Sequence, residues 1–193
     1  MAFPRDEQSS ILNDSMHTDL TQALHAIDST TREMTPEQLS CHPEGKWSAA
    51  EILEHLSITF SSTVRVMEKC LESGETRATA PTLYHRAAAF LVTEIGYFPS
   101  GRQAPEFARP KGIAAEQAVQ QIRENLAAMD TSLGRCEERF GLKVKIANHP
   151  VLGPLNLRQW RRFHLIHTRH HMKQIEALRR AVGFNPARRH GSW

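Results

Sequence analysis

Apolar side chains recur every three or four positions along four long segments of the chain, and stretches containing Pro and Gly separate these segments. Such spacing places the apolar residues on one face of an α-helix, because a helix advances about 100° per residue. The pattern predicts long helices over about 9–31, 48–73, 114–140 and 156–183. No segment alternates strictly between apolar and polar residues, so no series of strands is predicted. The chain is therefore expected to be all-α, a four-helix bundle.

Residues with capping chemistry mark where these helices begin and end. Ser48 stands three positions before Glu51, which is the spacing of a capping box. Asn156 is the predicted cap of the last helix, and Gly141 is expected to end the third. The run 35–39 is predicted to form a short capped turn because it begins with Thr and Pro.

The remaining segments are shorter. A short extra helix is expected over 81–95, and Pro and Gly predict loops at 41–46 and between His149 and Pro154. The 193 residues fit a single domain, which is long enough to bury a substantial core.

The last predicted helix concentrates histidines on the face expected to look into the bundle. Four of the eleven histidines of the chain fall between Phe163 and Met172. Eight residues share roughly 80° of arc on this helix: Leu157, Trp160, His164, His167, His171, Ile175, Leu178 and Val182. Three imidazoles therefore occupy the middle of an otherwise apolar wall.

Burying these imidazoles costs on the order of 1–3 kcal/mol for each polar group left without a partner. A metal ion offsets this cost because it takes the lone pairs of neutral imidazoles. His167 and His171 are the best pair, since residues four apart on a helix have Cβ atoms about 6 Å apart and can reach one ion at about 2.0–2.1 Å. His164 could replace one of them. The other explanation is a set of core histidines bonded to carboxylates or backbone.

A further ligand has to come from another helix, and His55 in the second predicted helix is the candidate. It lies at the flank of that helix's most apolar wall, near Ile52, Thr59 and Val66. This position is compatible with an interior metal site but does not require one. Judged alone, His55 is better explained as an ordinary partly buried histidine.

Two groups of residues resemble the signatures of the DinB/YfiT-like superfamily. The first group is T35-P-E-Q-L39, G45-K-W-S48 and E51-I-L-E-H-L56, and the second is H167-T-R-H-H171 followed by Gln174 and Ile175. In addition, H149-P-V-L-G-P-L155 with Trp160 resembles a branch of uncharacterised DinB-like domains. The resemblance covers roughly residues 10–182.

The resemblance implies a four-helix bundle in which one His of the second helix and an H-x-x-x-H pair of the last helix bind a metal ion. These positions correspond to His55, His167 and His171. The resemblance also implies nickel or zinc as the ion. Characterised members include thiol-dependent transferases and isomerases, so the expected partner is a small-molecule substrate, with a thiol as one candidate. The resulting hypothesis is a metal-dependent enzyme for hydrolysis or thiol-dependent transfer.

Three imidazole ligands would leave at least one open position on the ion, as in catalytic sites. Glu51, one turn before His55, is expected either to orient that ring or simply to complete the capping box. His164 and His149 stand where they could approach the site, and neither has an assigned role. A non-catalytic metal- or ligand-binding bundle is the alternative function.

Charge and composition limit the classes of function and the cellular locations that the sequence allows. The net charge is +3, and residues 158–189 are rich in Arg. No nucleic-acid motif accompanies that charge, so a solvated helix face is favoured over a phosphate-binding surface, and nucleic-acid binding is the least favoured function. No apolar run is long enough to span a bilayer, the N-terminus does not resemble a signal peptide, and three scattered cysteines do not indicate a disulfide framework. A cytoplasmic location is therefore expected, and homodimer formation stays open.

Overall fold

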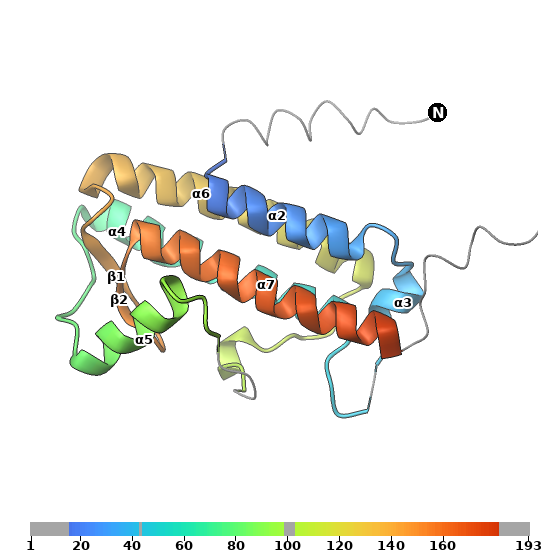
Figure 1. The fold of residues 1–193 in the computed structure, drawn as a ribbon. Helices are drawn as coiled ribbons and strands as arrows, with labels where there is room; N and C mark the ends of the chain where they lie inside the picture. Colours follow the sequence, from blue (N-terminus) through green and yellow to red (C-terminus); the bar gives the residue numbers. More distant parts are fainter. Residues whose placement is uncertain (1–15, 43, 99–102, 182–193) are drawn as a thin grey trace, which may run out of the picture.

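Four long helices make up most of the structure, a computed structural model that describes residues 16–42, 44–98 and 103–181. They are α2 (Thr18–Thr31), α4 (Ala49–Ser73), α6 (Ala115–Phe140) and α7 (Leu157–Ala181) (Figure 1). The predicted all-α class and four-helix bundle are confirmed. Residues 9–15 of the first predicted helix and the last two positions of the final one lie outside the described residues. None of the described helices is both long and apolar enough to cross a membrane.

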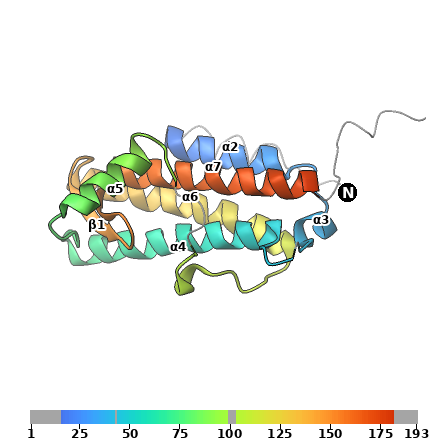
Figure 2. The same ribbon diagram turned by 60° about the horizontal axis from the view of Figure 1, so that its bottom comes forward.

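The long helices pack as two pairs. α4 lies mainly against α6, and α2 lies mainly against α7. Figure 2 shows α2 and α7 side by side, with α6 and α4 beneath them. Fully buried side chains such as Phe60 and Met67 of α4 and Leu126 and Met129 of α6 fill the space between the helices. Their burial removes apolar area from water at roughly 25 cal/mol per Å², which is the main force holding the pairs together.

Reciprocal side-chain caps begin two of these helices, at the residues Ser48 and Asn156 that the sequence predicted as caps. The Ser48 hydroxyl accepts from the Glu51 amide, and the Glu51 carboxylate accepts from the Ser48 amide at 2.8 Å. Asn156 and Gln159 form the same pair at the start of α7. Gly141, with φ +84°, ends α6. The two N-terminal caps satisfy backbone amides that have no partner within the helix.

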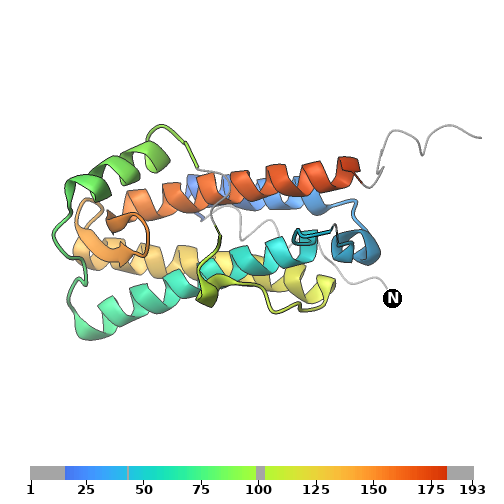
Figure 3. The ribbon, with the colours of Figure 1, turned by 90° about the horizontal axis from the view of Figure 1, so that it is seen from below.

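Three shorter helical segments join the long ones. α3 (Pro36–Ser40) is capped by Thr35, and α5 (Leu83–Thr93) is capped by Thr82. A 3-10 turn, η1 (Glu106–Ala108), follows α5 in the chain. Figure 3 shows α5 at one end of the bundle and α3 at the other. The predicted short helix over 81–95 therefore exists and is slightly shorter than expected.

The segment before α7 was predicted to be a loop, and this prediction was wrong. Two strands, β1 (Lys145–His149) and β2 (Gly153–Asn156), form an antiparallel hairpin. Ile146 and Leu155 are fully buried where the hairpin packs against the end of the bundle. The strands are short and include Gly153 and Pro154, so no alternating pattern was visible in the sequence. Tertiary burial, not local periodicity, makes this segment a hairpin.

Candidate metal site

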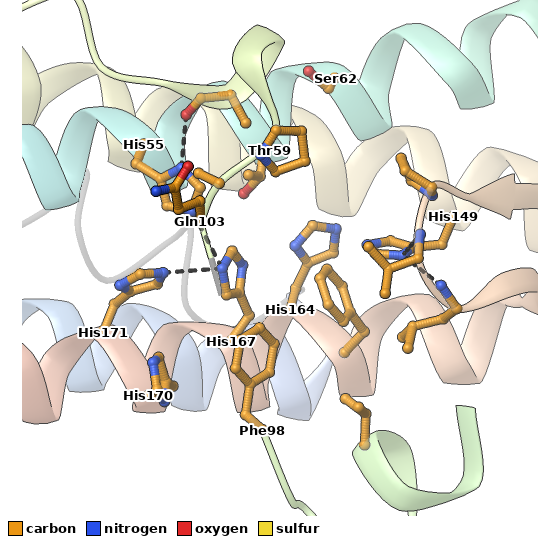
Figure 4. A pocket seen from close by; sticks show the side chains of 18 of the residues that line it. His55, Thr59, Ser62, Phe98, Gln103, His149, His164, His167, His170 and His171 are labelled. Carbon is orange, nitrogen blue, oxygen red and sulfur yellow. Dashed lines mark hydrogen bonds between the residues drawn. The ribbon is translucent and has the colours of Figure 1, made fainter. Parts of the chain in front are cut away.

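Three histidines from two helices converge in the interior of the bundle. His55 of α4 and His167 and His171 of α7 are each less than 8% exposed. One ring nitrogen from each lies within 4.8 Å of the other two. The Nε2 atom of His167 lies 3.3 Å from Nε2 of His55 and 3.0 Å from Nε2 of His171 (Figure 4). The structure thus brings together the three residues that the sequence singled out.

Hydrogen bonds to the outer nitrogens fix the orientation of two of these rings. Nδ1 of His55 donates to the Ala108 carbonyl at 2.7 Å, and Nδ1 of His171 donates to the Gln174 side-chain oxygen at 2.8 Å. Because Nδ1 holds the proton in both rings, the lone pair of each Nε2 points toward His167. Partners of this kind usually orient histidines that bind metals.

The third ring is held by packing. His167 stacks on Phe98 and on Phe163, with ring centroids 5.1 and 5.3 Å apart. Its Nδ1 is buried and has no hydrogen-bond partner among the described residues. Two aromatic faces therefore keep this imidazole in the plane that directs Nε2 toward the other two histidines.

These three imidazoles fit a divalent transition ion. Burial, with smaller contributions from the neighbouring histidines, lowers the pKa of His171 to about 3 and the pKa of His167 well below its ordinary value. Burial likewise lowers the pKa of His55. All three are therefore neutral at pH 7, which is the form that binds metals. Nitrogens held tetrahedrally about 2.0–2.1 Å from one ion stand about 3.4 Å apart, close to the two separations found here.

A second layer of contacts supports His55, and sequence reasoning missed it. The Glu54 carboxylate is 4% exposed and accepts hydrogen bonds from three successive backbone amides, those of Lys111, Gly112 and Ile113, at 2.9–3.2 Å. This contact holds the segment after η1 against α4, and η1 ends at the Ala108 carbonyl that orients His55. The partners of Glu54 are backbone amides more than fifty positions away along the chain, so no sequence motif identifies them. The one signal that could have found the contact was a charged residue on a buried helix face.

Glu51 plays the simpler of its two predicted roles. It completes the capping box with Ser48 and also lies 2.9 Å from Nε2 of His42. None of its contacts among the described residues reaches His55. The hypothesis that Glu51 orients the His55 ring is therefore not supported, because its carboxylate serves the helix start.

His164 lies beside the three-histidine cluster and is not part of it. The Thr63 hydroxyl donates to the Thr59 carbonyl at 3.1 Å, so its oxygen accepts from Nε2 of His164 at 2.9 Å. Nδ1 of His164 is buried without a partner among the described residues. Burial, and to a smaller extent His149, lowers the pKa of His164 to about 3. A neutral imidazole thus forms part of the wall next to the cluster.

His149 approaches the same region from the hairpin. Its Nδ1 accepts from the amides of Val151 and Leu152 at 3.2 and 3.1 Å, and its ring lies 4.3 Å from that of Phe163. Burial lowers the pKa of His149 to about 4. The structure therefore places both unassigned histidines on one side of the cluster, along α7 and the hairpin (Figure 4).

A cleft of about 1570 Å³ opens beside the cluster. The three clustered histidines, His164 and His149 all line it. Aromatic and aliphatic side chains from α4, α5, α7 and the segment around η1 form most of its walls. A small molecule in this cleft would lie against the three inward-facing nitrogens.

The arginines of α7 are largely engaged in contacts between helices. Arg161 pairs with Glu137 of α6, and Arg162 lies 3.6 Å from Asp19 of α2. Arg158 pairs with Glu94, next to α5. Much of the positive charge noted in the sequence therefore faces carboxylates of neighbouring segments.

Comparisons with known proteins agree with the fold. The model of the DinB superfamily matches residues 19–175. A solved structure of YfiT from Bacillus subtilis, described as a probable metal-dependent hydrolase with an unusual four-helix bundle topology, is similar with a TM-score of 0.54. The two chains share 18% sequence identity, and the match covers 96% of this chain and 93% of that one. A search of curated proteins found no match.

Proposed function

Because this chain belongs to the DinB superfamily, we propose that it is a metal-dependent enzyme acting on a small molecule. His55, His167 and His171 hold one divalent ion, nickel or zinc, and the reaction is a hydrolysis or a thiol-dependent transfer. The convergence of three neutral imidazole nitrogens at the wall of a large cleft is the observation that carries this proposal. We place the enzyme in the cytoplasm, where low-molecular-weight thiols are available.

The number of donors favours catalysis over a purely structural role. Structural zinc sites use four protein ligands, whereas catalytic sites use three and leave a position for water or substrate. Among the described residues, no fourth His, Cys, Asp or Glu joins the cluster. An ion bound by three neutral imidazoles keeps its full charge, and it can lower the pKa of bound water toward about 7 or activate a thiolate.

The protein's own residues prepare this position. The Ala108 carbonyl and the Gln174 side chain keep the protons of His55 and His171 on Nδ1, away from the cluster. Phe98 and Phe163 pack against the ring of His167 and fix its orientation. The ligand set is thus oriented before an ion or a substrate arrives, which limits the reorganisation needed during a reaction.

Elemental analysis of protein purified without chelator tests the metal site. We expect up to one nickel or zinc ion per chain, and its loss or marked reduction in each of the variants His55→Ala, His167→Ala and His171→Ala. His25→Ala is the matched control, because His25 is an exposed histidine of α2 outside both the cluster and the cleft. Unchanged metal content in a cluster variant would remove that residue from the ligand set.

Turnover assays separate an enzyme from a non-catalytic metal-binding bundle. The metal-loaded protein is assayed against a panel of carboxylic esters and a panel of electrophiles supplied with low-molecular-weight thiols. We expect activity in one panel, and loss of that activity in His171→Ala but not in His25→Ala. Stoichiometric metal with no turnover in either panel favours a bundle in which the ion only joins α4 to α7.

A further inference from the structure

The cleft extends far beyond the three histidines along α4. Thr59, Ser62 and Val66 line it after His55, and so does Lys69. Since a helix rises about 1.5 Å per residue, Arg65 lies about 15 Å and Lys69 about 21 Å from His55 along the helix axis. Both of these residues line the cleft. The cleft therefore suits an elongated ligand with one end at the histidines.

Most of the wall between these ends is apolar. Trp160 and Phe163 of α7 face it from one side, and Val66 of α4 faces it from another. Tyr84 and Leu91 of α5 also line it, although 59% and 45% of their surfaces are exposed. Exposed apolar side chains around a cavity are typical of a site that binds apolar ligand surface.

The charges along the cleft are all of one sign. No described residue that lines it is an Asp or a Glu, whereas Lys46, Arg65, Lys69 and Arg109 line it. None of these four cations forms an ion pair with a described carboxylate. A cleft lined by a single sign of charge concentrates ligands of the opposite sign.

Two of the cations form a pair at the end of the cleft remote from the histidines. Arg65 and Lys69 are one helical turn apart on α4, so their side chains are neighbours. The Arg65 guanidinium donates to the Ser62 hydroxyl at 2.9 Å, which directs it along the lining residues of the same helix. An anionic group between Arg65 and Lys69 would receive hydrogen bonds from both.

We propose that the cleft binds an elongated anionic amphiphile, with its anionic group at Arg65 and Lys69 and its apolar body along Phe163, Trp160 and α5. This proposal rests on the proposed function in one respect, because the reacting group of such a substrate would lie at the three histidines. The anion-binding end and the apolar wall are separate from the metal ligands. They can therefore be tested without turnover.

Calorimetric titration with three twelve-carbon probes below their micellar concentrations tests the charge selectivity. Dodecanoate, dodecanol and dodecyltrimethylammonium share an alkyl chain and differ in head-group charge. Dodecanoate should bind at least about tenfold more tightly than the other two, and added salt should reduce only this preference. Equal affinity for the three probes, or tighter binding of the cation, would overturn the proposal.

Variants of the two cations test where the carboxylate of dodecanoate binds. An exposed ion pair contributes up to about fivefold in affinity, so the double variant Arg65→Gln/Lys69→Gln should weaken dodecanoate binding about tenfold and leave dodecanol binding within about twofold. The double variant Lys173→Gln/Arg180→Gln removes two exposed cations of α7 outside the cleft, so it is the charge-matched control and should change neither affinity. Arg65 and Lys69 are exposed, so circular dichroism of their double variant should show an unchanged fold.

Measurements with and without chelator separate this inference from the proposed function. Chelated protein should keep its preference for dodecanoate, because the Arg65 and Lys69 pair does not depend on an ion. If the preference for dodecanoate disappears with the metal and is unchanged in the Arg65→Gln/Lys69→Gln variant, the carboxylate binds the metal ion. That result would overturn its placement at Arg65 and Lys69. Protein that binds no metal but selects dodecanoate through this pair would overturn the proposed function alone.

Discussion

Two glutamates one turn apart near the start of α4 differ in what they hold in place. Glu51 caps its own helix, whereas the buried Glu54 binds three amides of a distant segment. We predict that Glu54→Gln lowers the free energy of unfolding by about 2 kcal/mol, because hydrogen bonds to a charged acceptor are replaced by weaker ones. Release of that segment also frees the Ala108 carbonyl, so affinity for zinc should fall about tenfold or more.

Glu51→Gln is the control for this prediction. Glutamine also completes a capping box, so the free energy of unfolding should change by less than about 0.5 kcal/mol and metal affinity should stay the same. Denaturant titration and competition with a zinc-binding dye measure the two quantities. Equal effects of the two variants on metal affinity would show that Glu54 does not act through His55.

His164 gives the protein a predictable response to acid. Its pKa in the fold is about 3 because of burial, whereas an imidazole in an unfolded chain has a pKa near 6.5. Between these values the unfolded chain binds a proton that the folded chain does not, so stability falls as the pH decreases through this range. We predict that His164→Gln makes this fall shallower by about 1.4 kcal/mol per pH unit.

Urea titrations of chelated protein at pH 6, 5 and 4 measure this slope. The neighbouring buried His149, whose pKa is about 4, should retain its own share of the acid sensitivity in the variant. Metal content at pH 7 should not change, since His164 is outside the cluster. A slope identical to that of the unmodified protein would contradict burial of a neutral imidazole at this position.

At the scale of elements, the hairpin depends on the close approach of its turn to α5. Gly153 has φ +70°, and a Cβ at this position would meet the His85 ring. Gly153→Ala should therefore lower the free energy of unfolding by about 2 kcal/mol or more, through backbone strain and overpacking together. Gly134→Ala is the matched control, because a Cβ there meets nothing within 4 Å inside α6.

The control should change stability in the opposite direction. Alanine is favoured over glycine by roughly 0.5–1 kcal/mol within a helix, so Gly134→Ala should stabilise the protein. Thermal and denaturant unfolding measure both variants. If Gly153→Ala proved neutral, the hairpin would not be held against α5 in the way described.

At the scale of the whole molecule, the histidine cluster joins the two helix pairs of the bundle. α4 belongs to the pair with α6 and α7 to the pair with α2, so an ion bound by His55, His167 and His171 would cross-link them. An ion that binds only the folded state at 100 times its dissociation constant stabilises it by about 2.7 kcal/mol. We predict that chelation lowers the melting temperature by roughly 5–10 °C.

Differential scanning calorimetry with and without chelator measures this shift. His171→Ala should unfold at the same temperature in both conditions, because it has lost the metal already. A chelator effect of equal size in this variant would mean that the stabilising ion binds elsewhere.

The sequence by itself determined the features that depend on neighbours a few positions away. Helix faces follow from a period of 3.6 residues, the capping box of Ser48 and Glu51 follows from a spacing of three, and the pairing of His167 with His171 follows from a spacing of four. These are local relations, so they were readable in the chain. For His55 the sequence offered only a compatible position and a family resemblance.

Tertiary structure decided which distant groups meet. The Ala108 carbonyl at His55, the amides at Glu54 and the Thr63 hydroxyl at His164 come from segments tens of positions away along the chain. Tertiary structure also determines the hairpin, because burial of Ile146 and Leu155 against the end of the bundle stabilises its two strands. Such contacts depend on how the helices pack, and no periodicity of a single segment encodes that packing.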